Sequence, residues 1–201
     1  MNLKTGNTAG ATDADDDNDD DVCVDASPTK IKTPTAETTS ATQGGGAFNA
    51  LAGYIFGRNQ RDERMAMTTP VITSPLTPVD RPETKMSFVL PSRFWGDEEV
   101  LSAAPRPVDG SAVALEMGSG GLAGGASGAV AVLWFGGYAT KDEVARRTGE
   151  LRALIVASPA WREESVGPPP SEAPSFLLQY NDPFQPPWRR RNEIAIPVGP
   201  M

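Results

Sequence analysis

The pattern of apolar positions changes abruptly at a run of three glycines, residues 44–46. Before it, residues 1–43 are mostly Asp, Thr, Ala, Ser, Gly and Pro, with almost no large apolar side chain. Such a segment cannot bury enough surface to offset the entropy that ordering would cost. The pattern therefore predicts a disordered tail over residues 1–43, with an interaction tail as the alternative, and a folded domain over residues 44–201.

Helical periodicity begins directly after the glycines. Apolar residues recur with the spacing of a single helix face, which predicts an amphipathic helix that ends near Gly57. A second helix is predicted from Thr140, because Thr140 and Glu143 form a capping box, and it ends before Pro159. The inward residues of the first helix are Ala47, Phe48, Leu51, Ala52 and Ile55, and those of the second are Val144, Leu151, Leu154 and Ile155.

Strands are predicted where apolar and polar residues alternate with a period of two. Two of these strands, 112–117 and 129–135, are separated by a glycine-rich loop and are typical of a hairpin. The order of elements is helix, two strands, two strands, helix, two strands, which is typical of an α+β fold with mostly antiparallel pairing. The remaining predicted strands cover residues 64–68, 86–90, 176–180 and 191–198.

Charge separates the predicted tail from the predicted domain. The formal net charge is -8, but eight aspartates lie within residues 13–25 and the remainder is near neutral. The only basic cluster, Arg189 to Arg191, is too small for a nucleic-acid-binding face. No apolar run approaches the roughly 18 residues of a membrane span, and the single cysteine, Cys23, excludes an intrachain disulfide.

Histidine is absent from the whole chain. Its absence excludes histidine triads and the usual proximal ligand of haem. The acidic run Asp97 to Glu99 is interpreted as a solvated loop. The glycine-rich segment 118–123 loosely matches a dinucleotide fingerprint, but a strand rather than a helix follows it. We therefore predict that the chain is not an enzyme.

Five segments, taken in order, resemble the SOUL haem-binding protein family. The last is the longest, a proline-aromatic turn that leads into three arginines and a short strand. The resemblance covers roughly residues 47–198 and is greatest to the plant and algal branch. The five segments are residues 52–59, 65–71, 85–91, 135–140 and 179–198.

The resemblance implies a distorted, mostly antiparallel β-barrel with two flanking helices, made of two similar halves. Members of the family usually carry two strands before the first helix. Because residues 1–43 show no strand of the expected kind, we expect the domain to be N-terminally incomplete.

The resemblance also implies that haem or a related tetrapyrrole binds in a hydrophobic cleft along the first helix. Its candidate residues there also fit a second interpretation, in which they simply pack on the sheet. The terminal arginines would pair with propionates, or else with Glu193 or a carbonyl to hold the turn, and the tryptophan would stack on the ring or cover the barrel end. The candidates are Phe48, Leu51, Ala52, Ile55, Trp188, Arg190 and Arg191.

Without histidine, haem would be bound mainly through apolar contacts and through pairing of its propionates. Tyr54 and the methionines at 65, 67 and 86 could reach iron, but methionine is also a common gap-filler in cores.

The leading hypothesis is a non-catalytic tetrapyrrole carrier or buffer with a possible protein partner in tetrapyrrole metabolism. The alternative is an adaptor module without a ligand site, and an enzyme or accessory acting on tetrapyrroles is a weaker third. The resemblance implies a chloroplast location, with the cytoplasm as the alternative.

Overall fold

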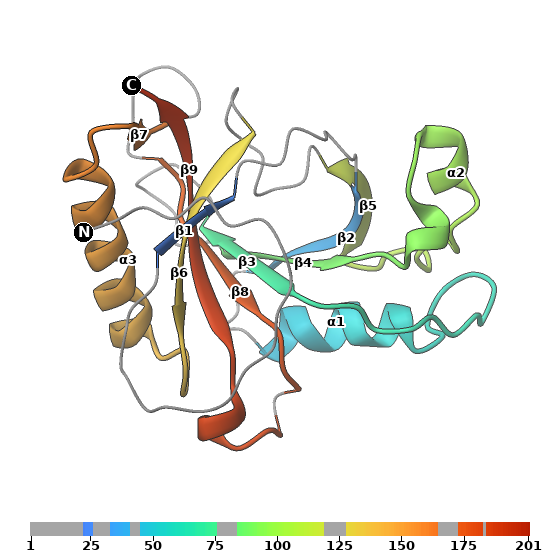
Figure 1. Ribbon diagram of the computed structural model, residues 1–201. Coiled ribbons are helices and arrows are strands. Elements are labelled where there is room, and N and C mark those ends of the chain that lie inside the picture. The colour runs from blue at the N-terminus through green and yellow to red at the C-terminus, as the bar shows by residue number, and fades with distance from the viewer. Residues whose placement is uncertain are drawn as a thin grey trace, which may run out of the picture.

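A twisted antiparallel sheet runs through the described part of the chain, with α-helices beside it (Figure 1). The computed structural model describes residues 22–25, 33–40, 45–75, 84–118, 128–164, 173–182 and 184–201. Its elements are β1 Val22–Asp25, β2 Thr33–Ser40, α1 Gly45–Ile55, β3 Val71–Pro75, β4 Thr84–Val89, η1 Ser92–Phe94, α2 Glu98–Ser102, β5 Val113–Gly118, β6 Ala129–Phe135, α3 Lys141–Val156, β7 Trp161–Glu163, β8 Phe176–Gln179, η2 Pro187–Arg189 and β9 Asn192–Pro200.

The strand order confirms the α+β class with antiparallel pairing. The described strands follow the path β1-β6-β9-β8-β3-β4-β2-β5, and β7 pairs with β9 outside that path. Closing a barrel would require the two end strands, β1 and β5, to pair with each other. No pairing among the described residues joins them, so the sheet is open where a closed barrel was expected. A third α-helix, α2, was also not expected.

The sheet is built from two similar halves, as the resemblance implied. One half runs β2-α1-β3-β4, in the order strand, helix, strand, strand, and the other runs β6-α3-β8-β9 in the same order, with the short strand β7 inserted between α3 and β8. Their strand orders, β2-β4-β3 and β6-β9-β8, mirror each other. The halves therefore meet at β3 and β8, where Thr73 is paired with Leu177.

The expectation that no strand precedes the first helix is wrong. β2 lies between β4 and β5, where Ala36 pairs with both Phe88 and Leu115, and β1 pairs with β6. β2 was missed because its sequence has threonines and no large apolar residue, while its place in the sheet is shown by backbone pairing on both edges. The rest of the predicted tail lies outside the described residues.

Three further expectations differ from the structure. Residues 64–68 do not form a strand, because the Met65 amide donates to the carbonyl of Ile55 at the end of α1 (2.8 Å). The acidic run that was interpreted as a loop begins α2, where the Asp97 carboxylate accepts a hydrogen bond from the Val100 amide (3.0 Å). β5 and β6 are not hairpin partners, since β5 pairs with β2 while β6 pairs with β1 and β9.

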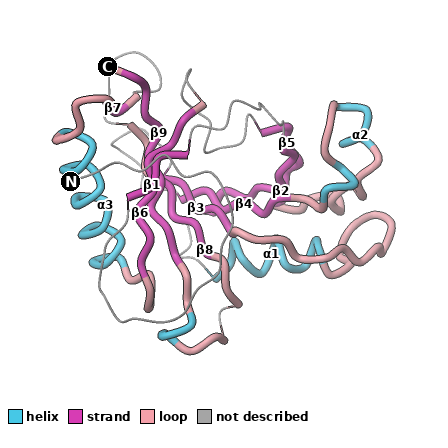
Figure 2. The backbone as a smooth tube through the Cα atoms, in the orientation of Figure 1, coloured by secondary structure: helices cyan, strands magenta, loops and turns pink. Residues whose placement is uncertain are grey.

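Helices α1 and α3 pack on the same face of the sheet, over different halves (Figure 2). Val71 of β3 belongs to the core beneath α1. Thr73 shares the face of Val71 by period two and pairs with Leu177, which packs with the core beneath α3. The opposite face has its own small cluster, built from Ile72, Phe176, Leu178 and Ala195.

The start of α3 confirms the predicted capping box. The Thr140 hydroxyl accepts a hydrogen bond from the Glu143 amide (3.3 Å). Hydrogen bonds from Arg146 and Arg147 lower the pKa of the Glu143 carboxyl to about 2. Leu151 and Ile155 are buried as predicted. This cap fixes where the chain turns from β6 into the helix, and so it positions the pocket described next.

Candidate ligand-binding site

A pocket of about 310 Å³ lies where the two halves of the sheet meet α3. Its floor is a row of paired residues across three strands, Thr73, Leu177 and Ile194. One wall comes from α3 and the segment that leads into it. The full lining is Thr73, Ala139, Lys141, Val144, Thr148, Ser175, Phe176, Leu177 and Ile194.

The lining is mainly apolar, with one cation at its rim. The hydroxyl of Thr148 donates to the carbonyl of Val144 (2.7 Å), so this polar group is already satisfied. Lys141 is exposed and contacts no acidic side chain among the described residues. The volume is at the lower end of the ~300–1,000 Å³ typical of ligand pockets. The pocket therefore suits an apolar group with a negative charge beside it.

Of the four candidate ligand-binding residues on α1, two lie in the core and two lie on one flank of the helix. None of the four lines this pocket. Leu51 and Ile55 are fully buried in the core beneath α1, as the packing interpretation predicts. Phe48 is partly buried, and its ring centre lies 5.6 Å from that of Phe88 in an edge-to-face contact. Ala52 is half-buried on the same stripe as Phe48, one helical turn further on.

Arg191 holds the start of β9 together. Its Nε and Nη2 atoms donate to Oε1 of Glu193 at 3.0 and 2.6 Å, and the Tyr180 hydroxyl donates to Oε2 (2.6 Å). Burial is the main cause that raises the pKa of the Tyr180 hydroxyl, and the hydrogen bond to Glu193 raises it further. Glu193 is almost fully buried, and a buried carboxylate needs such partners. The pairing with Glu193 that was considered for this turn is therefore present.

Arg190 and Trp188 lie at the end of the molecule rather than over the pocket. Arg190 donates from Nε to the carbonyl of Gln185 (2.8 Å), and its guanidinium carbon lies 4.6 Å from the ring centre of Tyr138. Trp188 is exposed and covers no end of the sheet. Their contact with a propionate stays a prediction.

Most of the side chains that were considered as iron ligands make other contacts in the structure. The Tyr54 hydroxyl donates to the carbonyl of Pro105 (2.7 Å), and burial raises its pKa to about 12, so the phenolate is disfavoured. Met65 is buried in the core, Met86 packs against that core, and Met67 is partly exposed. The pocket lining contains no sulfur, imidazole or phenol group. None of these lining side chains is therefore of a kind that usually ligates haem iron.

Sequence reasoning missed most of the pocket residues, because four separate segments supply them. No local pattern marks Thr73, Ser175 or Ile194 as neighbours, since the junction between β3 and β8 brings them together. The capping box at Thr140 was the one available signal, because it places Lys141 and Val144 in the first turn of a helix.

Comparison with known proteins identifies the family. The profile of the SOUL heme-binding protein family matches residues 26–197. The chain belongs to the SOUL family. The match begins before β2, so the family domain includes a strand that the sequence analysis assigned to the tail.

One solved structure similar to this SOUL protein is described as a crystal structure of a hydrolase from Listeria innocua. It is 14% identical, with a TM-score of 0.55, and the match covers 89% of this chain and 91% of the other. At this identity the likeness shows the fold alone. No curated protein matches the chain. Within the described residues, no helix is long and apolar enough to cross a membrane.

Proposed function

We propose that this SOUL protein binds haem or a related tetrapyrrole without catalysis, as a carrier or buffer, and that the pocket beside α3 holds one edge of the ring. The observation that carries the proposal is an apolar pocket with a cation at its rim in a chain of this family. Tetrapyrroles present an apolar ring with carboxylates at one edge, which this arrangement complements.

Each part of the pocket would have a separate role. Leu177, Ile194 and Val144 would remove the ring edge from water, worth about 25 cal/mol per Å² of apolar surface. Lys141 would meet a propionate at the rim, where the contact is partly screened by salt. Bound haem would supply the iron, and no side chain of the pocket lining would ligate it.

A matched pair of variants tests the location. Thr148→Phe should fill the pocket and weaken haem binding by about tenfold or more, a loss of at least 1.4 kcal/mol. Ala145→Phe adds a similar ring on the exposed side of the same helix and should leave binding unchanged. The measurement is haem titration of both purified proteins, followed by absorbance.

A second pair tests the cleft along α1 that the family resemblance implied. Ala52→Phe crowds the half-buried flank of α1, whereas Asn49→Phe adds a ring at an exposed position of that helix. If Ala52→Phe abolishes binding while Thr148→Phe does not, the ring lies along α1 and the pocket assignment is wrong. If haem does not bind the unaltered chain at all, the adaptor hypothesis replaces the carrier hypothesis.

A further inference from the structure

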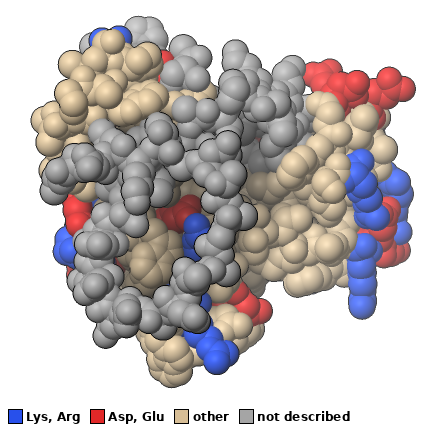
Figure 3. Space-filling model, in the orientation of Figure 1, with Lys and Arg blue, Asp and Glu red and all other residues tan. Residues whose placement is uncertain are grey.

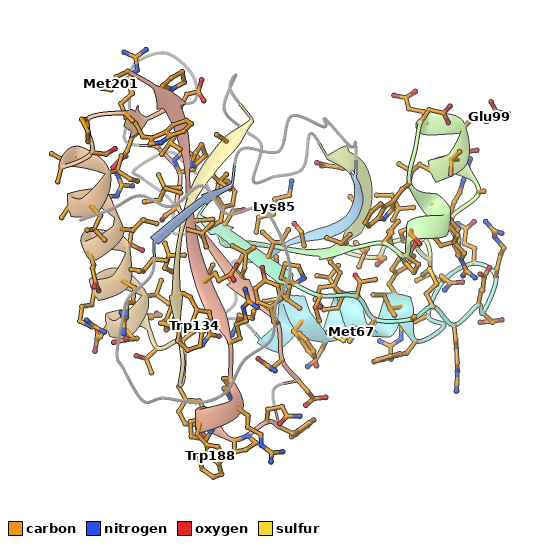
Figure 4. The ribbon with its side chains drawn as sticks, viewed as in Figure 1. Met67, Lys85, Glu99, Trp134, Trp188 and Met201 are labelled. Carbon is orange, nitrogen blue, oxygen red and sulfur yellow. The ribbon has the colours of Figure 1, made fainter. Side chains whose placement is uncertain are left out.

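Two loops form a protruding end of the molecule below β6 and β9. They are the β6–α3 connection at Gly137 and the β8–β9 connection at Pro187, and the Gly137 amide donates to the Pro187 carbonyl (3.1 Å). Figure 4 shows Trp188 projecting from this end, away from the sheet. We name the group the aromatic tip, and it consists of Tyr138, Phe184, Trp188, Arg189 and Arg190.

The three rings of the aromatic tip are unusually exposed. Phe184 is 93% exposed, Trp188 is 80% and Tyr138 is 56%. A single exposed apolar side chain is ordinary, but a group of large rings at one end of a molecule marks an interaction surface. Because the rings lie on two loops that are bonded to each other, the cluster belongs to the folded structure.

Hydrogen bonds hold the longer loop in this shape. The Phe184 amide donates to the Asp182 carboxylate (2.7 Å), and the Gln185 amide donates to the Asp182 carbonyl (3.0 Å). Pro186 and Pro187 restrict the backbone before Trp188. A surface that is ordered before it binds loses little conformational entropy on contact, so the exposed rings are prepared for a partner.

Cations lie among these rings. Arg190 is stacked on Tyr138, and Arg189 is exposed. In Figure 3 basic side chains lie beside uncharged and acidic ones at this lower end of the molecule. Two acids lie close in sequence: Asp182 is exposed and accepts a hydrogen bond from the Phe184 amide, and Glu193 is paired with Arg191.

We propose that the aromatic tip docks on the surface of a phospholipid membrane that contains anionic lipid. Tryptophan and tyrosine favour the depth of the headgroups, and guanidinium groups pair with lipid phosphates. The tip protrudes from the end of the molecule (Figure 4). Protruding rings enter a deformable lipid surface readily, whereas a protein partner would need a matching pocket.

This inference does not depend on tetrapyrrole binding. Tyr138 directly precedes Ala139, which lines the pocket, so docking would also bring the pocket rim close to the lipid. A chain that docks on vesicles but binds no haem would leave the inference intact and remove the proposed function.

Flotation of the full chain with vesicles tests the proposal. One set of vesicles contains phosphatidylcholine alone and the other contains equal parts of phosphatidylcholine and phosphatidylserine. We expect the protein to float with the mixed vesicles, with a blue shift of tryptophan emission. The net charge of -8 would repel anionic lipid, so general attraction cannot produce this result.

Variants of the tip then assign the contact. Trp188→Ala with Phe184→Ala should reduce partitioning by about tenfold or more, as removal of two interfacial rings predicts, with an unchanged melting temperature. Arg189→Glu should remove the preference for mixed vesicles. Phe56→Ala with Val156→Ala removes two exposed apolar side chains elsewhere and should change nothing. If no vesicle binds the chain, or if both double variants behave alike, the tip is not a lipid-docking surface.

Discussion

Removal of residues 1–43 is expected to abolish cooperative folding of this SOUL protein. β2 pairs with β4 along one edge and with β5 along the other, and β5 has no other partner strand among the described residues. Without β2, the backbone groups of both neighbours lose their partners at about 0.5–1.5 kcal/mol for each hydrogen bond. The summed loss is comparable with the whole stability of a typical domain, about 5–15 kcal/mol.

Circular dichroism during heating measures this effect. The shortened chain should show no cooperative transition. A chain that lacks only residues 1–21 retains β1 and β2 and should melt as the full chain does. If removal of residues 1–43 left the melting temperature unchanged, β2 would contribute nothing to the fold, and a dispensable tail over the whole of residues 1–43 would be correct.

Leu51→Asp is expected to lower the free energy of unfolding by more than about 3 kcal/mol. The Leu51 side chain is fully buried among Ile55, Val71 and Phe88. The substitution loses about 1.5–3 kcal/mol of apolar burial and places a carboxylate where it has no partner. Urea unfolding provides the measurement.

Asn49→Asp is the matched control, because Asn49 is exposed on the same helix and should tolerate the charge. Equal urea midpoints for the two variants would contradict burial of the α1 face. If Leu51→Asp unfolded normally but bound no haem, Leu51 would face a ligand, as the family resemblance implied.

The sequence predicted the elements whose side chains carry a clear period. β6 has the predicted bounds, and α3 begins at the predicted cap because Thr140 satisfies a backbone amide locally. β2 was not predicted because its sequence has no apolar period. The strand pairs with a neighbour on each edge instead. Whether the sheet closes into a barrel also could not be predicted from any single segment, since closure depends on contacts between distant strands.

The candidate site was less predictable than the fold. Periodicity placed Leu51 and Ile55 on an apolar helix face, but it cannot distinguish a face that packs on a sheet from one that lines a cleft. Arg191 could be assigned to Glu193 only as one alternative, because the sequence does not show that Tyr180, just after β8, also donates to Glu193. The pocket itself exists only where β3 meets β8.

Parallel titration of the full chain with haem and with iron-free protoporphyrin tests the central claim most directly. Because the pocket lining contains no sulfur, imidazole or phenol group to ligate iron, the dissociation constants should agree within about tenfold, or 1.4 kcal/mol. Thr148→Phe should weaken both. Much tighter binding of haem would show that the protein ligates the metal outside this pocket. Failure of both rings to bind would contradict tetrapyrrole binding altogether.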